Sequence, residues 1–553
     1  MNNLRKKVLG GLFLFSSSFA FAQNPGQISG NFQVDFQVYQ PDSLIGAEEV
    51  PEGLLMNGFA NVNYTRDEFS AGLRYESYLN PMLGFDTRYK GSGITYRYAS
   101  YDNGFIKATI GNFYDQFGSG LLLRAYEERN LGYDNAFDGF HIAVNPGKGV
   151  RLKALIGKQR AFFDYSNGIV RGFDGEWVLN EGLKSMETSA TTVIVGGSFV
   201  SKFQADQDPF YKLPENVAAG SGRLNIIRGG FDFFTEYAYK INDPSAANGF
   251  IYKPGEALLV TASYSRKGMG IILGAKRIDN MDFRSDRTAT GNVLLINYLP
   301  ALTKQHTYTI AAFYPYATQP NGELGVQGEL FYTFKKGSFL GGKYGTKLSV
   351  NLSAAQSIER SPIHDTIAVG ESGTLGYESE FLTPGETVYF RDFNFTLTKK
   401  FSKKWKGSFM YMNQSYNKAV IEGKPGFLKN QILVAEAQYK INTRHSIRME
   451  AQGLFMEDDA NPDNVDFGSW ALGLVEYTVA PHYFVAVQDL YNYGNPDKTR
   501  RIHYFLASAG YVKGSSRIAL NYGKQRAGIF CVGGICREVP ASSGLSVSIT
   551  SSF

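Results

Sequence analysis

Beyond its N-terminal region, the sequence lacks an apolar stretch of the roughly 20 residues that a membrane-spanning helix needs. Helical periodicity is also nearly absent. Charged residues make up 19% of the chain, below the roughly 25% of soluble domains, whereas aromatic residues make up 14%. A chain without spanning helices is either soluble or crosses a membrane as a barrel, and this composition favours the barrel.

Features of enzymes and of nucleic-acid binders are also missing. The formal charge is only +5, three units of which come from residues 5–7, so no nucleic-acid partner is expected. The six histidines lack the i, i+3 or i, i+4 spacing of metal ligands, and no metal or other cofactor is expected. The Gly-Ser-Gly at 118–120 has no recognisable base partner, so we interpret it as flexible backbone and expect no enzymatic activity.

The N-terminus has the pattern of a secretory signal peptide. Basic residues at 5–7 precede an apolar run from Val8 to Phe21, and residues 20–22 form an A-x-A cleavage site. A membrane anchor would need a longer run. We therefore expect residues 1–22 to be removed and residues 23–553 to form a single exported domain.

Period-2 alternation recurs along the rest of the chain. In residues 28–38, for example, Phe32, Val34 and Phe36 share one face and polar residues share the other. We count about 26 candidate strands, with a range of roughly 24 to 28, many of them long enough for a tilted membrane crossing. The sequence thus predicts an all-β fold, a transmembrane antiparallel β-barrel.

Loop lengths separate this barrel from a soluble β-sandwich, which also alternates. Tight connections with turn residues alternate with longer polar segments, as outer-membrane barrels require of their two rims. The tight connections include 66–67, 101–103, 145–149, 266–267, 402–403 and 442–444, and the longer ones include 80–92, 113–137, 203–221, 356–387, 456–467 and 524–541. The asymmetry predicts that the N- and C-termini are both periplasmic.

The C-terminal segment supports the same interpretation. Leu545, Val547 and Ile549 alternate with small polar residues, and the chain stops at Phe553. A terminal alternating strand ending in Phe resembles the signal by which insertion machinery recognises outer-membrane barrels. We therefore expect location in the cell outer membrane, with membrane lipid and the barrel insertion machinery as partners.

The two cysteines, Cys531 and Cys536, enclose a turn between the last two expected strands, on the outer side of the membrane. Their central Gly-Gly allows the chain to fold back and bring the two sulfurs within bonding distance. A metal site would need two more ligands, which are not apparent. We predict a structural disulfide that contributes only about 2 kcal/mol.

The segment from Phe113 to Phe137 is the most informative region outside the strands. Three consecutive leucines, residues 121–123, are unsuited to an exposed loop. Folded into the lumen, they would cover the wall while nearby charges face a water channel. A cap over the extracellular rim uses the same residue types, so both alternatives stay open. The candidate pore-constricting residues are Asp115, Arg124, Glu127, Glu128, Arg129 and Asp134.

Four strings carry a family resemblance: residues 72–99 (GLRYESYLNPMLGFDTRYKGSGITYRYA), 111–139, 155–160 (LIGKQR) and 531–553. They resemble a family of Bacteroidetes outer-membrane barrel proteins of unassigned function. The resemblance implies a barrel and assigns no catalytic residues. More loosely, the loop after an early strand is similar to that of porin-like channels, in which such a loop narrows the pore.

A barrel of about 26 strands is wider than ordinary porins and must either conduct or be filled. We therefore expect a porin-like channel for small polar solutes with a loop-constricted polar lumen. The alternative is a plugged structural or accessory barrel of a secretion or surface-assembly complex, which binds protein partners through its extracellular loops. A barrel-embedded lipid hydrolase is a third hypothesis, for which no serine and histidine pair can be placed.

Overall fold

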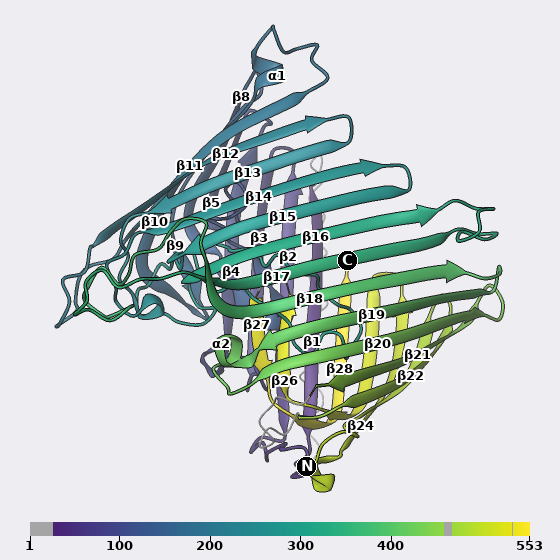
Figure 1. Ribbon diagram of the computed structural model, residues 1–553. Helices are drawn as coiled ribbons and strands as arrows, with labels where there is room; N and C mark the ends of the chain where they lie inside the picture. The colour runs from purple at the N-terminus through teal and green to yellow at the C-terminus, as the bar shows by residue number, and fades with distance from the viewer. Residues whose placement is uncertain (1–25, 458–466, 533–534) are drawn as a thin grey trace, which may run out of the picture.

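A computed structural model describes residues 26–457, 467–532 and 535–553, so the expected signal peptide lies outside the described residues. Twenty-four antiparallel strands form one continuous sheet (Figure 1), close to the predicted number. The strands of this wall are β1 (Gln27–Tyr39), β2 (Leu54–Arg66), β3 (Phe69–Leu79), β4 (Gly91–Asp102), β5 (Ile106–Phe113), β8 (Phe137–Gly147), β9 (Val150–Ala161), β10 (Asp164–Val178), β11 (Thr192–Phe203), β12 (Asn216–Arg228), β13 (Phe231–Lys240), β14 (Gly255–Arg266), β15 (Met269–Asp279), β16 (Gly322–Phe334), β17 (Thr346–Ile358), β18 (Pro384–Lys400), β19 (Trp405–Asn417), β20 (Phe427–Lys440), β21 (His445–Met456), β22 (Trp470–Val479), β23 (Tyr483–Tyr491), β24 (His503–Lys513), β25 (Ser516–Gln525) and β28 (Ser542–Ser552).

The shorter elements lie in the connections. Two hairpins are formed by β6 (Glu127–Glu128) with β7 (Tyr133–Asp134) and by β26 (Gly528–Val532) with β27 (Ile535–Val539). The helices are α1 (Leu179–Gly182), α2 (Lys418–Glu422) and the 3₁₀ turns η1 (Thr87–Tyr89), η2 (Arg129–Leu131), η3 (Ala246–Asn248) and η4 (Lys498–Arg500). None of the helices in the described part of the chain has the length and apolar character needed to span a membrane.

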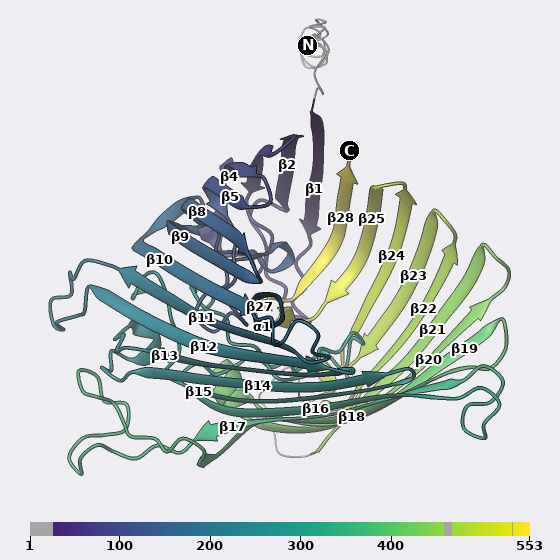
Figure 2. The same cartoon turned by 90° about the horizontal axis from the view of Figure 1, so that it is seen from above.

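The sheet closes on itself between its first and last strands. β28 pairs with β25 on one side and with β1 on the other, in a register that runs from Asn31 opposite Ser552 to Tyr39 opposite Gly544. Figure 2 shows β1 and β28 side by side. This pairing closes the barrel that the sequence predicts, so the described wall has no free edge.

The two faces of the wall differ as the alternation predicts. In β3, Leu73 and Tyr75 point outward and are exposed, whereas Arg74, Glu76 and Tyr78 point inward and are buried. An apolar outer face and a polar inner face are what a membrane-spanning barrel requires, because lipid contacts one face only. The inward residues are buried although they are charged, so the lumen beside them is filled.

The two rims differ in the length of their connections. One rim carries tight turns such as residues 67–68 between β2 and β3 and Gly229–Gly230 between β12 and β13, where both glycines have positive φ. Residues 179–191 and 335–345 are longer exceptions on this rim. Because the strand number is even, β1 begins and β28 ends on the same tight-turn rim. In outer-membrane barrels that rim is the periplasmic one.

Substitution on the two faces of β28 tests this assignment. Val547 lies opposite Phe36 and Leu520 on the outward face, whereas Ser548 is its inward neighbour. Val547→Arg is expected to cost about 2 to 4 kcal/mol, because it places a charge in lipid. Ser548→Arg should be tolerated. The heat-modifiable gel mobility of the two variants measures the difference, and equal behaviour would reverse the faces.

Candidate functional site in the lumen

Two connections between wall strands fold into the lumen. The first lumen segment, residues 114–136, joins β5 to β8, and the second lumen segment, residues 280–321, joins β15 to β16. Both carry apolar side chains that pack against inward residues of the wall. The barrel is therefore occupied by its own chain.

The three leucines of the first lumen segment form its apolar anchor. Leu121, Leu122 and Leu123 are fully buried in one cluster with inward wall residues such as Val170 of β10 and Val200 of β11. Of the two alternatives for this segment, folding into the lumen is therefore the one observed. The cap over the rim is not observed, because the leucines pack against the inner wall and the second lumen segment.

The second lumen segment crosses to the opposite part of the wall. Its N-terminal part packs beside the leucines through Phe283 and Ile296, and its C-terminal part packs through Ile310 and Phe313 against the inner faces of β17 to β24. Backbone hydrogen bonds join it to the first segment, with Arg124 donating to the Ile296 carbonyl at 2.8 Å. Together the two segments contact most of the inner wall.

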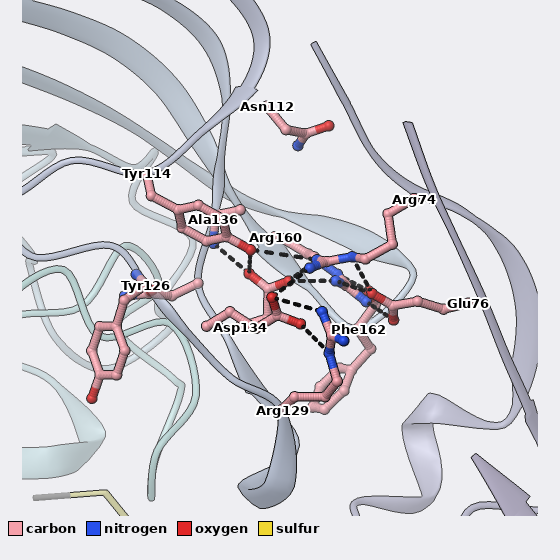
Figure 3. A network of polar contacts seen from close by, with 12 residues as sticks. Arg74, Glu76, Asn112, Tyr114, Tyr126, Arg129, Asp134, Ala136, Arg160 and Phe162 are labelled. Atoms are coloured by element: carbon pink, nitrogen blue, oxygen red, sulfur yellow. Dashed lines mark hydrogen bonds and ion pairs between the residues drawn. The ribbon is translucent and has the colours of Figure 1, made fainter. Parts of the chain in front are cut away.

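Buried ion pairs hold the end of the first lumen segment to the wall (Figure 3). Asp134 accepts hydrogen bonds from Arg74 of β3, from Arg160 of β9 (2.6 Å) and from the Tyr114 hydroxyl (3.0 Å). The two arginines share Glu76, at 2.8 Å from Arg74 and 2.6 Å from Arg160. The carboxylate of Asp134 thus ties the segment to two wall strands.

The same network continues along the first lumen segment. Arg74 also contacts Glu127 at 2.8 Å, and Glu127 pairs with Arg129 at 3.0 Å. The network contains three guanidinium groups and three carboxylates, so its formal charges cancel. Although burial acts to raise it, the pKa of Asp134 is lowered by Arg160 and Arg74. The side chain is therefore charged at neutral pH.

The remaining candidate residues lie elsewhere in the lumen. Asp115 pairs with His141 at 2.9 Å and Lys153 at 2.7 Å, and these partners outweigh burial and lower its pKa. Arg124 lies between two tyrosine rings, 4.4 Å from the centroid of Tyr126 and 4.1 Å from that of Tyr298. Glu128 is half-buried in the β6–β7 hairpin. The structure thus joins Glu127, Arg129 and Asp134 and separates the other three candidates from them.

Sequence reasoning missed the wall residues of this network and the second lumen segment. A signal for Arg74 and Glu76 was present, because they alternate with Leu73 and Tyr75 in β3 and must therefore share the inward face. Their partner Arg160 lies at the end of β9, and nothing local connects it to them. A role in constricting a pore stays a prediction for the six candidates.

The β26–β27 hairpin occupies the connection between β25 and β28 and contacts the lumen segments. The Asn292 side chain of the second lumen segment donates to the Cys536 carbonyl, and Arg526 stacks 3.6 Å from the Phe313 ring centroid. The sequence predicts this hairpin on the outer side of the membrane, and it lies on the rim with long connections. It folds inward because its flanks find aromatic and amide partners there.

The register of this hairpin places Cys531 directly opposite Cys536. We expect the two cysteines to be linked in protein isolated without reductant, and the barrel to remain folded after reduction because so small a loop contributes only about 2 kcal/mol. Intact-mass measurement after alkylation, with and without prior reduction, distinguishes the states. Two alkylated thiols in the unreduced sample would contradict the prediction.

Ser119, in the Gly-Ser-Gly at residues 118–120, is held by a wall residue and not by a histidine. Its hydroxyl donates to Glu236 of β13 at 2.6 Å. A serine nucleophile needs a base that accepts its proton and is itself oriented, as a histidine does. In the described ranges, no group of three or more His, Cys, Asp or Glu side chains is arranged to hold a metal ion.

Two cavities border the hairpin inside the lumen. One, of about 420 Å³, lies among residues 84–89, residues 131–135, residues 290–294 and the hairpin residues Cys536–Glu538. The other, of about 500 Å³, lies between residues 303–316, the inner faces of several late strands and the other flank of the hairpin. Water and small solutes therefore have space beside the packed segments.

Comparison with solved structures finds other barrels at low identity. The translocation pore of the P pilus usher PapC is 9% identical with a TM-score of 0.45, covering 95% of this chain and 99% of the pore. The siderophore receptor PirA from Pseudomonas aeruginosa is 10% identical with a TM-score of 0.41, covering 95% and 80%. A porin of Rh. blastica is 11% identical with a TM-score of 0.26, covering 66% and 100%.

Curated proteins give no match to this sequence. A family model does match, and it extends over residues 4–553, which include every described strand and both lumen segments. The resemblance to a family of unassigned function is thereby confirmed. The chain belongs to the family of unknown function DUF6029.

Proposed function

We propose that this protein is a porin-like channel of the outer membrane whose passage is restricted by its own lumen segments. The packing of both segments along the inner wall carries the proposal, because a closed barrel of this size either conducts or is filled. The filling here is incomplete, since two cavities remain beside the hairpin. Such a lumen suits slow passage of small polar solutes.

Location in the outer membrane belongs to the same proposal. The apolar outward face fits lipid, and only closed barrels or helices satisfy their backbone hydrogen bonds there. The expected signal peptide supplies export, and the terminal residues Leu545, Val547, Ile549 and Phe553 supply the expected recognition signal for insertion. Leu545 of β28 and Phe553, which follows this strand, are exposed and thus accessible to such machinery.

Swelling of proteoliposomes tests the channel. Liposomes that contain the folded protein should swell in a small polar solute such as a pentose, and progressively more slowly in larger sugars. Liposomes with heat-unfolded protein are the control. Swelling no faster than this control with any solute would contradict the channel and favour a plugged accessory barrel.

The accessory barrel keeps one specific observation in its favour. On the rim with long connections, Phe210 and Leu382 are 89% and 73% exposed, and exposed apolar groups of this kind often mark protein contacts. In this alternative, Phe210→Ser with Leu382→Ser weakens a crosslinkable partner complex in the membrane and leaves swelling unchanged. A channel without partners shows no such complex in either protein.

A further inference from the structure

The smaller of the two cavities has one arginine whose charge is not balanced. Arg537 of β27 lines it, with its guanidinium 4.1 Å from the ring centroid of Phe85. Its Nε and Nη1 atoms are buried and have no hydrogen-bond partner within the described part of the chain. Stacking on the ring fixes the position of the guanidinium and leaves these donors unused.

The other charged groups around this cavity are paired. Arg88 contacts Asp86 at 2.6 Å, Arg160 contacts Asp134 at 2.6 Å, and Glu538 contacts Lys424 at 2.7 Å. Each of these interactions neutralises the charge within the protein. Unlike these charged residues, Arg537 has no carboxylate partner among the described residues.

Arg537 as a whole is half-buried, but its Nε and Nη1 atoms have lost their hydration without gaining a counter-ion, which is costly. Burial accordingly lowers the pKa of Arg537. An arginine that served only packing could be replaced by an uncharged side chain with a gain in stability. A ligand that brings a negative charge to Nε and Nη1 would instead offset the desolvation free energy through charge-assisted hydrogen bonds.

We propose that this cavity binds a small organic molecule that carries one oxyanion, a carboxylate or a phosphate, with Arg537 as its charged partner. The volume of about 420 Å³ is within the range of small-molecule sites. Phe85 and Phe162 line the same cavity and give the ligand an apolar surface for a compact ring or alkyl body. The site is defined by its geometry and does not depend on solute flux.

Ligand-dependent thermal stability of the folded protein in detergent tests the site. Benzoate and phenyl phosphate serve as probes, and benzamide is the uncharged control of the same shape. We expect the two anions, but not benzamide, to raise the unfolding midpoint of the wild type. If only one of them acts, it identifies the oxyanion as carboxylate or phosphate. No shift with either anion would overturn the proposal.

The variant Arg537→Gln tests whether the anion binds in this cavity or elsewhere on the protein. Without ligand, the variant should be at least as stable as the wild type, because it removes a half-buried charge that has no counter-ion. Its apparent affinity for the active anion should fall roughly 10- to 100-fold, the range expected for a lost charged hydrogen bond. Arg526→Gln is the matched control, because Arg526 lines the larger cavity, and it should keep the wild-type shift.

Three results would contradict the site at Arg537: an unchanged shift in Arg537→Gln, loss of the shift in Arg526→Gln instead, or lower stability of ligand-free Arg537→Gln. If Arg537→Gln does not fold, Thr290→Trp provides a second variant. Thr290 is an exposed residue that lines the same cavity, so the indole should fill the space and abolish the shift while Arg537 remains. A wild-type shift in this variant would also overturn the proposal.

Discussion

Deletion of residues 119–133 is expected to raise the single-channel conductance several-fold in planar bilayers. The deletion removes the leucines that cover the inner wall, together with the backbone that is hydrogen-bonded to the second lumen segment. It keeps Asp115 and Asp134, whose ion pairs hold the two ends of the first lumen segment. A shortened, anchored connection thus remains while the obstruction is reduced.

The 119–133 deletion changes the size of the obstruction without changing the net charge of the lumen. The deleted stretch contains two arginines and two glutamates, so the net charge of the lumen is unchanged. Ion preference should therefore stay near the wild-type value while conductance rises. Deletion of the exposed residues 362–372, in a long connection outside the lumen, is the control and should leave conductance unchanged.

An unchanged conductance in the 119–133 deletion, with heat-modifiable mobility that shows a folded barrel, would contradict the restricted-channel model. The same deletion would then be expected to weaken a partner complex, as the accessory alternative requires. A rise in both deletions would indicate general loosening of the barrel. These outcomes separate the loss of an obstruction from the loss of a docking surface.

Asp134→Asn is expected to lower the free energy of unfolding by about 3 to 5 kcal/mol, the cost of breaking a buried ion pair. The substitution preserves shape and leaves Arg74, Arg129 and Arg160 with only two carboxylates, Glu76 and Glu127. Urea titration of the folded protein measures the change. Asp86→Asn breaks a more exposed pair with Arg88 and should cost at most about 1 kcal/mol.

The pH dependence of this contribution follows from the lowered pKa of Asp134. A carboxylate whose pKa is lower in the folded state stabilises above its unfolded pKa and loses that contribution as the pH falls through the folded value. The difference between wild type and Asp134→Asn should therefore be full at neutral pH and shrink in acid. A difference that does not change with pH would show that Asp134 acts through shape alone.

The wall of the barrel could be predicted because alternation is local. Each strand carries its own inward and outward residues, as Leu73 and Arg74 do in β3, so faces and closure follow without knowledge of distant partners. The second lumen segment could not be recognised in this way. Residues 293–299 are apolar enough to resemble a strand, yet they lie inside, hydrogen-bonded to the first lumen segment and not to the wall ladder.

The site was predicted in part for a similar reason. The charges of the first lumen segment and its leucines are visible in the sequence, and the leucines required an apolar surface. Their partners depend on how far the segment reaches and on which wall strands meet there. Contact between Asp134 and Arg160 depends on the reach of the segment and on the wall strands beside it. No spacing or periodicity in the sequence predicts this contact.

The seam between β1 and β28 also constrains the order of assembly. Tyr39 and Gly544 are neighbours across this seam although nearly the whole chain separates them, so this pairing has very high contact order and is expected to form late. The two lumen segments are attached at both ends to wall strands and have to be enclosed as the wall curls around them. A cell that makes this protein must therefore protect a partly curled sheet, with two apolar segments and two unpaired strand edges, until the last strand arrives.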